Sequence, residues 1–137
     1  MKKLLLILFS LPILTLAQKT YVPDDNFENY LEAFGMGDGI MLNDSVLTGN
    51  INTVTYLDVN NQNISDLTGI EDFIALTSLY CHSNQLTSLD IGNCSLLEYF
   101  YCNLNQLTTL DVSNNLALTH FGCIDNQLTS LDISNNL

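Results

Sequence analysis

The chain has 137 residues and a formal net charge of -12, from 15 acidic residues against three lysines. Only 13% of the residues are charged and 47% are hydrophobic, which excludes a disordered acidic tail and favours one compact domain. The acidity argues against nucleic acid and against an anionic membrane, because both need clustered lysines or arginines. The chain has only two histidines, the side chain that most often acts as a general acid or base, so we expect no enzyme.

Residues 1–17 have the three parts of a secretory signal peptide. Met1, Lys2 and Lys3 form a basic start, residues 4–16 form an apolar run, and Thr15 and Ala17 place small side chains before a cleavage point. The run is shorter than the about 20 apolar residues that cross a bilayer, so an uncleaved anchor is the weaker alternative. We therefore predict a secreted or outer cell-surface protein, with no transmembrane helix in the mature chain.

Residues 18–53 are predicted to form an N-terminal cap, with a helix over about 24–34 followed by a loop. Asp24 has the side chain of a helix N-cap, and Gly35 suits the helix end. One apolar face is expected from Phe27, Tyr30, Leu31 and Phe34. The glycine- and asparagine-rich stretch 35–50 is typical of a loop. A helix placed directly before a repeat array most often caps the array, although a partner-binding helix is the alternative.

From residue 54 to residue 137 the chain repeats itself. Four coils begin at positions 54, 76, 97 and 118, and the last coil is incomplete. The pattern L-x-x-L-x-[LC]-x-x-N-x-L is the leucine-rich repeat signature. Within each coil the half-spacings of 10 and 11 residues are too short for a return helix of two turns. We therefore predict a leucine-rich repeat solenoid, with parallel β-strands on the concave face, short extended or 3-10 segments on the back, and an N-terminal helical cap.

The chain stops at the twentieth position of its last coil, and no distinct C-terminal cap follows. Two expectations arise from this ending. The sequence is a fragment of a longer protein, or the uncapped C-terminal coil exposes a strand edge that supports self-association.

Strand alternation assigns some columns of equivalent residues to the inside of the stack. One such column is Leu57, Leu79, Phe100 and Phe121, and the next is Val59, Cys81, Cys102 and Cys123. A third column, whose amides can pair the backbone groups where each coil turns, is Asn84, Asn105 and Asn126. Neighbouring strands lie ~4.8 Å apart, whereas a disulfide needs Cβ atoms near ~3.8 Å, so buried thiols are favoured over disulfides. Cys94 has no cysteine at the equivalent position of the next two coils, which carry Asn115 and Asn136 there. It is predicted to be a loose thiol or a local packing residue.

The outward positions of the same strands carry the candidate ligand-binding residues. These are Tyr56, Tyr80, His82, Tyr99, Tyr101 and His120. Tyrosine offers contact area and a hydroxyl at low entropic cost, which favours a binding surface on the concave face. Cross-strand support of the sheet is the alternative, because aromatic neighbours also stabilise a sheet.

No catalytic residue, metal or cofactor is predicted. Cys81 and His82 are adjacent on a strand and point to opposite faces, which defeats a zinc site. Asp90, Asp111 and Asp132 recur at one outward position of the coils. They are predicted to form a solvated convex edge, with a weak calcium stripe as the alternative.

The 21-residue coil with cysteine at an inward leucine position resembles the cysteine-ladder subgroup of the bacterial internalins. The stretches Val22–Phe27 and Ile64–Phe73 look like the secreted leucine-rich repeat proteins of Bacteroidetes. The resemblance covers about residues 20–137 and implies surface or secreted proteins that bind other molecules through the concave face. The predicted function is thus a non-catalytic binding module for a protein or a surface glycan. The alternative is a structural spacer, or the front of a longer secreted protein whose function lies beyond residue 137.

Overall fold

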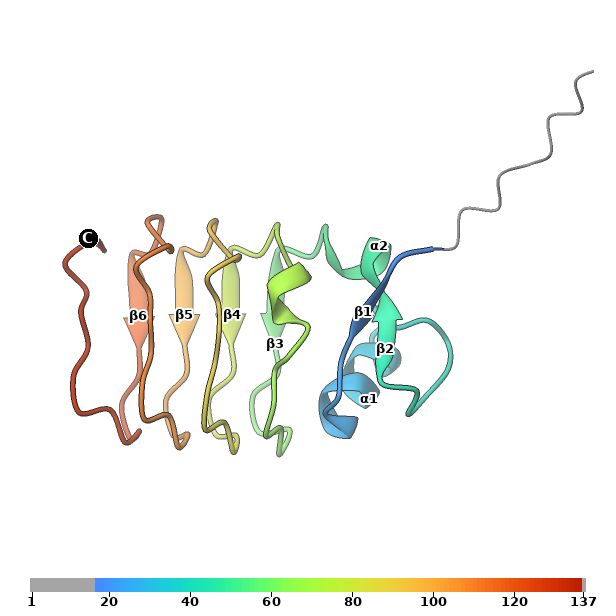
Figure 1. Cartoon of the computed structure of the whole chain (residues 1–137), viewed down its shortest axis with the longest axis horizontal. Helices are drawn as coiled ribbons and strands as arrows, with labels where there is room; N and C mark the ends of the chain where they lie inside the picture. Colours follow the sequence, from blue (N-terminus) through green and yellow to red (C-terminus); the bar gives the residue numbers. More distant parts are fainter. Residues whose placement is uncertain (1–16, 137) are drawn as a thin grey trace, which may run out of the picture.

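The computed structural model describes residues 17–136. The predicted signal peptide therefore lies outside the described residues, apart from Ala17. Figure 1 shows coils stacked along one axis, with the N-terminal cap at one end of the stack. Within the described part of the chain, no helix has the length and apolar character needed to cross a membrane.

Each coil contributes one short strand to a parallel sheet. The strands are β3 (Tyr56–Asp58), β4 (Ser78–Tyr80), β5 (Tyr99–Tyr101) and β6 (His120–Gly122), in the order β3-β4-β5-β6. In the register Leu57 pairs with Leu79, Leu79 with Phe100, and Phe100 with Phe121. Because each step of the register joins equivalent coil positions, the columns expected from the repeat are present, and the fold is a leucine-rich repeat solenoid.

The back of the solenoid consists of extended and turning backbone with little regular structure. Backbone N–H groups of Gln85, Gln106 and Gln127 donate to carbonyls of the preceding coil at 2.8–2.9 Å. Of the predicted 3-10 segments, one is present in residues 17–136, the 3-10 helix η1 (Ile70–Asp72) of the first coil. The later coils have turns at the equivalent place. Gly69, with φ 105°, opens η1 where its backbone packs on the cap, since a Cβ there would lie 2.9 Å from the Tyr21 carbonyl oxygen.

The cap contains more regular structure than the sequence predicts. Besides the helix α1 (Asp25–Ala33), it has an antiparallel pair of strands, β1 (Lys19–Tyr21) and β2 (Ser45–Leu47), and a short helix α2 (Thr48–Ile51). The prediction of a loop over 35–50 is therefore wrong at its C-terminal end. Three-residue strands leave no periodic signal, and β2 exists because β1, 26 residues away, pairs with it.

Helix α1 buries Phe27 and Leu31 completely, and the Phe27 ring stacks on that of Phe73 in the first coil, with centroids 6.3 Å apart. Phe34 departs from the predicted apolar face, because it is 65% exposed and stacks on Tyr30 with the ring centroids 4.4 Å apart. It is the C-cap residue, where the backbone leaves the helix at φ -101°, so its side chain turns off the buried face. Gly35 follows at φ 73°, and Met36 donates to the carbonyl of Leu31, which completes the usual glycine C-terminal motif.

Asp24 joins the cap to the first coil. One carboxylate oxygen accepts the N–H groups of Asn26 and Phe27 at 3.0 Å and caps α1. The other accepts the N–H and the hydroxyl of Ser65, both at 2.8 Å, and the N–H of Asp66 at 3.2 Å. Burial raises the pKa of Asp24, but the hydrogen bonds from Ser65, Phe27 and Asp66 outweigh it, so the pKa lies below the ordinary 3.8.

Replacing Asp24 by alanine is expected to lower the free energy of unfolding by about 2–3 kcal/mol at pH 7, because it removes an N-cap and a buried acceptor. Since the folded-state pKa is depressed, this stabilisation is present above the ordinary pKa of 3.8 and is lost as the pH falls below it. Urea unfolding at pH 7, 4 and 3 measures the difference. Asp25→Ala, an exposed neighbour, is the control, and an equal loss in both variants would contradict the assignment.

Candidate functional site: the strand face

The outward side chains of β3 to β6 form one continuous surface, which we call the strand face. Five of the six predicted ligand-binding residues lie on these strands: Tyr56, Tyr80, Tyr99, Tyr101 and His120. His82 lies two residues beyond the end of β4, where its backbone N–H donates to Asn60 at the edge of the face. The register places Tyr56 level with Ser78, Tyr99 and His120. It places Tyr80 and Tyr101 in the next row, level with Asp58 and Gly122. Tyr56 is 58% exposed and the other three tyrosines are half-buried.

The tyrosines of the strand face contact one another across the strands. The Tyr80 and Tyr101 rings are stacked, with centroids 5.5 Å apart and an interplanar angle of 10°. Tyr56 leans diagonally onto Tyr80, also at 5.5 Å but tilted by 43°. Level with Tyr56 in the register, Tyr99 stacks on His120 at 4.5 Å. These contacts support the sheet, and they explain why Tyr80, Tyr99 and Tyr101 are half-buried although they lie on an outer surface.

The smallest residue of the strand face makes room for the largest. A Cβ at Gly122 would lie 2.8 Å from Cδ1 of Tyr101 and 3.0 Å from Oδ1 of Asn103, so the Tyr101 ring lies over the Gly122 backbone. Asn60 and Asn103 also bind the neighbouring coils, because their Oδ1 atoms accept the N–H groups of His82 and Ile124 at 2.8 Å. These contacts hold the polar edge of the face in one arrangement.

Asp58 is the carboxylate of the strand face. Its Oδ1 accepts the N–H of Asn60 at 3.2 Å, and the Tyr56 hydroxyl lies 3.5 Å from its Oδ2. Tyr30 of the cap helix donates its hydroxyl to the Asp58 carbonyl oxygen. Partial desolvation, and after it the Asp58 charge, raise the pKa values of both Tyr30 and Tyr56. The face is therefore polar and negative at its cap end.

Inside the sheet, the cysteine column lies directly behind the strand face. Cys81 and Cys102 are fully buried, Cys123 is half-buried, and all are free thiols. Burial raises the pKa of Cys102 to about 12 and that of Cys81 well above its usual 9.0. The column packs as small apolar side chains and contributes no nucleophile to the surface.

Native-state alkylation is expected to label Cys123 first among the four cysteines. A pKa near 12 leaves Cys102 about a thousandth of the thiolate of an ordinary cysteine, and burial also excludes the reagent. Iodoacetamide at pH 8 followed by peptide mass spectrometry measures the rates, with guanidinium-unfolded chain as the reference. The raised pKa values also predict that stability falls as the pH rises above 9, where only the unfolded thiols ionise. Equal labelling of Cys102 and Cys123 would contradict this account.

The asparagine column closes each coil behind the strands. Asn84, Asn105 and Asn126 each donate to two carbonyls at the strand ends at 2.8–3.1 Å, and each accepts at least one N–H of the preceding coil. The amide thus serves the unpaired backbone groups of the turn.

A second column of the same kind lies on the return side, and Cys94 begins it. Asn115 donates to the carbonyls of Ile91 and Cys94, and Asn136 to those of Val112 and Asn115. The Cys94 thiol donates to the Ile70 carbonyl at 3.4 Å, in the equivalent position. Cys94 is fully buried and its thiol takes the hydrogen-bonding position of the asparagine, which favours the local packing residue over the loose thiol of the two predicted alternatives.

The predicted aspartate row shapes turns on the side of the solenoid. The Oδ1 atoms of Asp90, Asp111 and Asp132 each accept an N–H two residues further on at 2.9 Å. Hydrogen bonds from Ser113 and Ser134 lower the pKa values of Asp111 and Asp132. Two hollows of about 300 and 360 Å³ lie beside the row. All three aspartates are exposed, and in the described residues they form no close cluster of three carboxylates.

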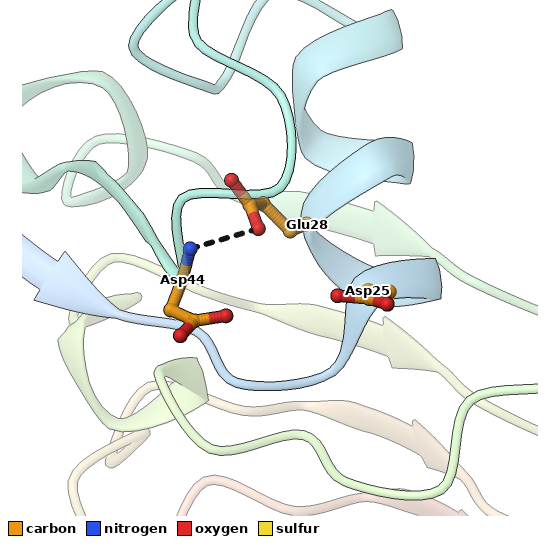
Figure 2. Close-up of side chains that lie close together, drawn as sticks. All are labelled: Asp25, Glu28 and Asp44. Atoms are coloured by element: carbon orange, nitrogen blue, oxygen red, sulfur yellow. Dashed lines mark hydrogen bonds between the residues drawn. The ribbon is translucent and has the colours of Figure 1, made fainter.

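Such a cluster of acids occurs instead in the cap, among residues 17–136. One oxygen each from Asp25, Glu28 and Asp44 lies within 4.8 Å of the others (Figure 2). Glu28 is fully buried, and its two oxygens accept the N–H groups of Asn43 and Asp44 at 2.9 and 3.1 Å. Both oxygens are thus engaged in holding the loop, so this geometry is explained by structure and does not indicate a metal centre.

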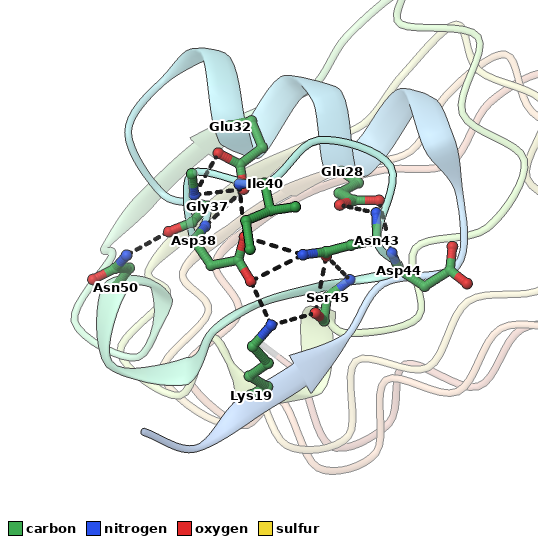
Figure 3. Close-up of polar contacts among 11 residues, drawn as sticks. Lys19, Glu28, Glu32, Gly37, Asp38, Ile40, Asn43, Asp44, Ser45 and Asn50 are labelled. Atoms are coloured by element: carbon green, nitrogen blue, oxygen red, sulfur yellow. Dashed lines mark hydrogen bonds and ion pairs between the residues drawn. The ribbon is translucent and has the colours of Figure 1, made fainter. Parts of the chain in front are cut away.

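The loop between α1 and β2 is held by several further carboxylate contacts (Figure 3). Glu32 accepts the N–H groups of Asp38 and Gly39, and Asp38 forms an ion pair with Lys19 at 2.7 Å. The held loop exposes three consecutive apolar side chains, those of Ile40, Met41 and Leu42, by 57–65%. The sequence prediction did not include this exposed surface. The signal that could have indicated it is the run of three apolar residues within a polar loop.

Fold and columns together define a leucine-rich repeat protein with a cysteine column. No protein-family model matches the chain. Over 72 residues it is 39% identical to Internalin J of Listeria monocytogenes serotype 4b (strain F2365), a match that covers 52% of this chain and 7% of Internalin J. The chain is therefore similar to a Listeria internalin but spans a small part of that protein's length.

Solved structures show the same likeness. The functional domain of InlJ from Listeria monocytogenes, which includes a cysteine ladder, superimposes with a TM-score of 0.76 at 38% identity, covering 90% of this chain and 28% of that chain. The internalin InlF of strain 4b F2365 superimposes with a TM-score of 0.70 at 24% identity, covering 84% of this chain and 33% of that chain, which shows the fold alone. The leucine-rich repeat architecture and the likeness to the internalins are thus confirmed.

Proposed function

We propose that the chain is a non-catalytic binding module, exported through its N-terminal signal peptide, that recognises a protein or a surface glycan with the strand face. The observation that carries this proposal is a diagonal series of rings on an outer surface, which we call the tyrosine row: Tyr56 contacts Tyr80, and Tyr80 stacks on Tyr101. Stacked rings lose little freedom on binding, because their positions are already restricted before a partner arrives.

The similarity to Internalin J supports this proposal, since the matching solved structure is described as the functional domain of that protein. The same proposal includes secretion, a protein of the secreted Bacteroidetes type, and domain boundaries after residues 17 and 53. It also includes the assignment of the strand face to the concave side of the solenoid.

The competing function is a passive spacer, which leaves the tyrosine row with structural support alone. The test is binding of the chain to a glycan array and to an array of extracellular proteins. The double variant Tyr80→Ala/Tyr101→Ala is expected to weaken a specific signal about tenfold or more, the size of a binding hot spot. Tyr21→Ala is the matched control, because Tyr21 is 61% exposed and lies on the cap strand β1.

A double variant that binds every target as well as the unaltered chain would exclude the strand face. A chain that binds nothing on either array would favour the spacer. Thermal unfolding of each variant separates a loss of binding from a loss of fold.

A further inference from the structure

We propose that the partner is a protein segment that presents an arginine to the cap end of the strand face, with its guanidinium stacked on Tyr56 and paired with Asp58. The inference rests on the proposed function of the strand face and adds the chemistry of the partner. It commits to a cationic protein segment, in place of the broader choice between a protein and a glycan.

The geometry of the tyrosine row favours one position for a planar cation. Tyr80 and Tyr101 are nearly parallel, so each covers part of the other's ring face. Tyr56 is tilted by 43° from Tyr80 and is 58% exposed, so its ring remains accessible at the end of the row. A guanidinium group stacks on an aromatic face better than an ammonium group does, because it is planar and more weakly hydrated.

The Asp58 carboxylate is within reach of a cation placed on Tyr56. Its Oδ2 lies 3.5 Å from the Tyr56 hydroxyl, a long contact, and its Oδ1 accepts the N–H of Asn60. Over residues 17–136 the one lysine–carboxylate pair is that of Lys19 with Asp38, in the cap. Asp58 is therefore a half-buried carboxylate on a binding surface with no cation from the described chain beside it.

The charge of the whole chain points the same way. All 15 acidic residues lie after residue 17, where Lys19 is the remaining lysine or arginine. Such a chain attracts cationic partners and repels anionic ones over a Debye length. A neutral glycan would use the tyrosine hydroxyls but would leave the Asp58 charge without a partner, so the observations favour the arginine-bearing segment.

The experiment titrates ¹⁵N-labelled chain with a capped peptide of alternating Gly-Ser and arginine units, and with the same peptide in which citrulline replaces each arginine. Citrulline keeps the planar shape and removes the charge. Amide shifts are expected to centre on residues 56–60 and 78–82. The arginine peptide should bind about tenfold more tightly, and its affinity should fall as NaCl is raised from about 50 to 300 mM.

Two variants locate the charge. Asp58→Asn retains an oxygen that can accept the Asn60 N–H. It is expected to weaken binding of the arginine peptide about fivefold, as the loss of one half-buried carboxylate contact near the surface would. Asp111→Asn makes the same change at an exposed aspartate with an equivalent turn contact, and should leave the affinity unchanged. Tyr56→Leu should weaken binding to a similar extent as Asp58→Asn, with Tyr21→Leu as its control.

Equal binding of the two peptides, or no binding at millimolar peptide, overturns the inference. So do equal effects of Asp58→Asn and Asp111→Asn, or shifts centred on the hollow of about 300 Å³ that is lined by Asp66, Glu71 and Asp90. In each of these cases the proposed function still stands if Tyr80→Ala/Tyr101→Ala weakens binding on the arrays about tenfold or more. If the double variant leaves array binding intact, the proposed function itself fails.

Discussion

Replacing Asn105 by alanine is expected to lower the free energy of unfolding by about 3–5 kcal/mol. The side chain is 7% exposed, its Oδ1 accepts the N–H of Leu86, and its Nδ2 donates to the carbonyls of Cys81 and Cys102, each at 3.0 Å. Alanine leaves the Leu86 N–H without a partner inside the coil, which costs about 1–3 kcal/mol. It also removes one of two asparagine hydrogen bonds from the Cys81 carbonyl, which keeps Asn84, and from the Cys102 carbonyl, which keeps Asn126, at about 1 kcal/mol each. The loss exceeds that of an ordinary hydrogen-bond deletion because a single amide serves three chain segments.

Urea unfolding followed by circular dichroism measures this loss. Asn114→Ala is the matched control, since Asn114 is exposed in a turn and a surface change of this kind stays within about 0.5 kcal/mol. Asn126→Ala, in the last coil, should cost less than Asn105→Ala because Asn126 is only half-buried. Similar losses for Asn105→Ala and Asn114→Ala would refute the role given to the asparagine column.

Phe100→Ala is expected to have an effect of the same size, about 3–5 kcal/mol. Phe100 is fully buried in the middle of the stack, paired in register with Leu79 on one side and Phe121 on the other. Its ring stacks on Phe121 with centroids 5.5 Å apart. Truncation removes the transfer free energy of the ring and leaves a cavity that two neighbouring coils cannot both fill.

Phe121→Ala is the natural comparison, because Phe121 occupies the same column but is half-buried. It should cost clearly less than Phe100→Ala in the same urea titration. If the two substitutions cost the same, burial along the column does not decide stability, and the account of the inward columns is wrong. Neither substitution alters an outward side chain, so array binding by the folded fraction should be retained.

Several features followed from the sequence because the repeat is nearly exact. Leu79, Phe100 and Phe121 follow one another at intervals of 21 residues. A constant spacing places equivalent apolar side chains in one column, as the strand register has them. The same argument predicted the asparagine column and the free thiols behind the strands. The strand face was likewise assigned from alternation alone, since a strand sends neighbouring side chains to opposite sides.

Other features depended on contacts between segments far apart in the chain. Glu28 lies in the first turn of α1, where a carboxylate suits the positive end of the helix dipole. It is nevertheless buried, because residues 43–44 fold over it. The pairing of β1 with β2 and the exposed triplet from Ile40 to Leu42 have the same origin. Cys94 aligns with Asn115 in the sequence, but its hydrogen bond to Ile70 exists only when two coils are stacked.

By itself, the sequence determined the solenoid, its inward columns and the set of outward tyrosines, because all of these depend on period and alternation. Tertiary structure alone decided which tyrosine ring remains open, which carboxylates are engaged by backbone, and how the cap closes the first coil. Ring tilts and loop closures depend on neighbours in the adjacent coil and on the free energy of packing against them. A one-dimensional pattern carries no information about those neighbours until the coils are stacked.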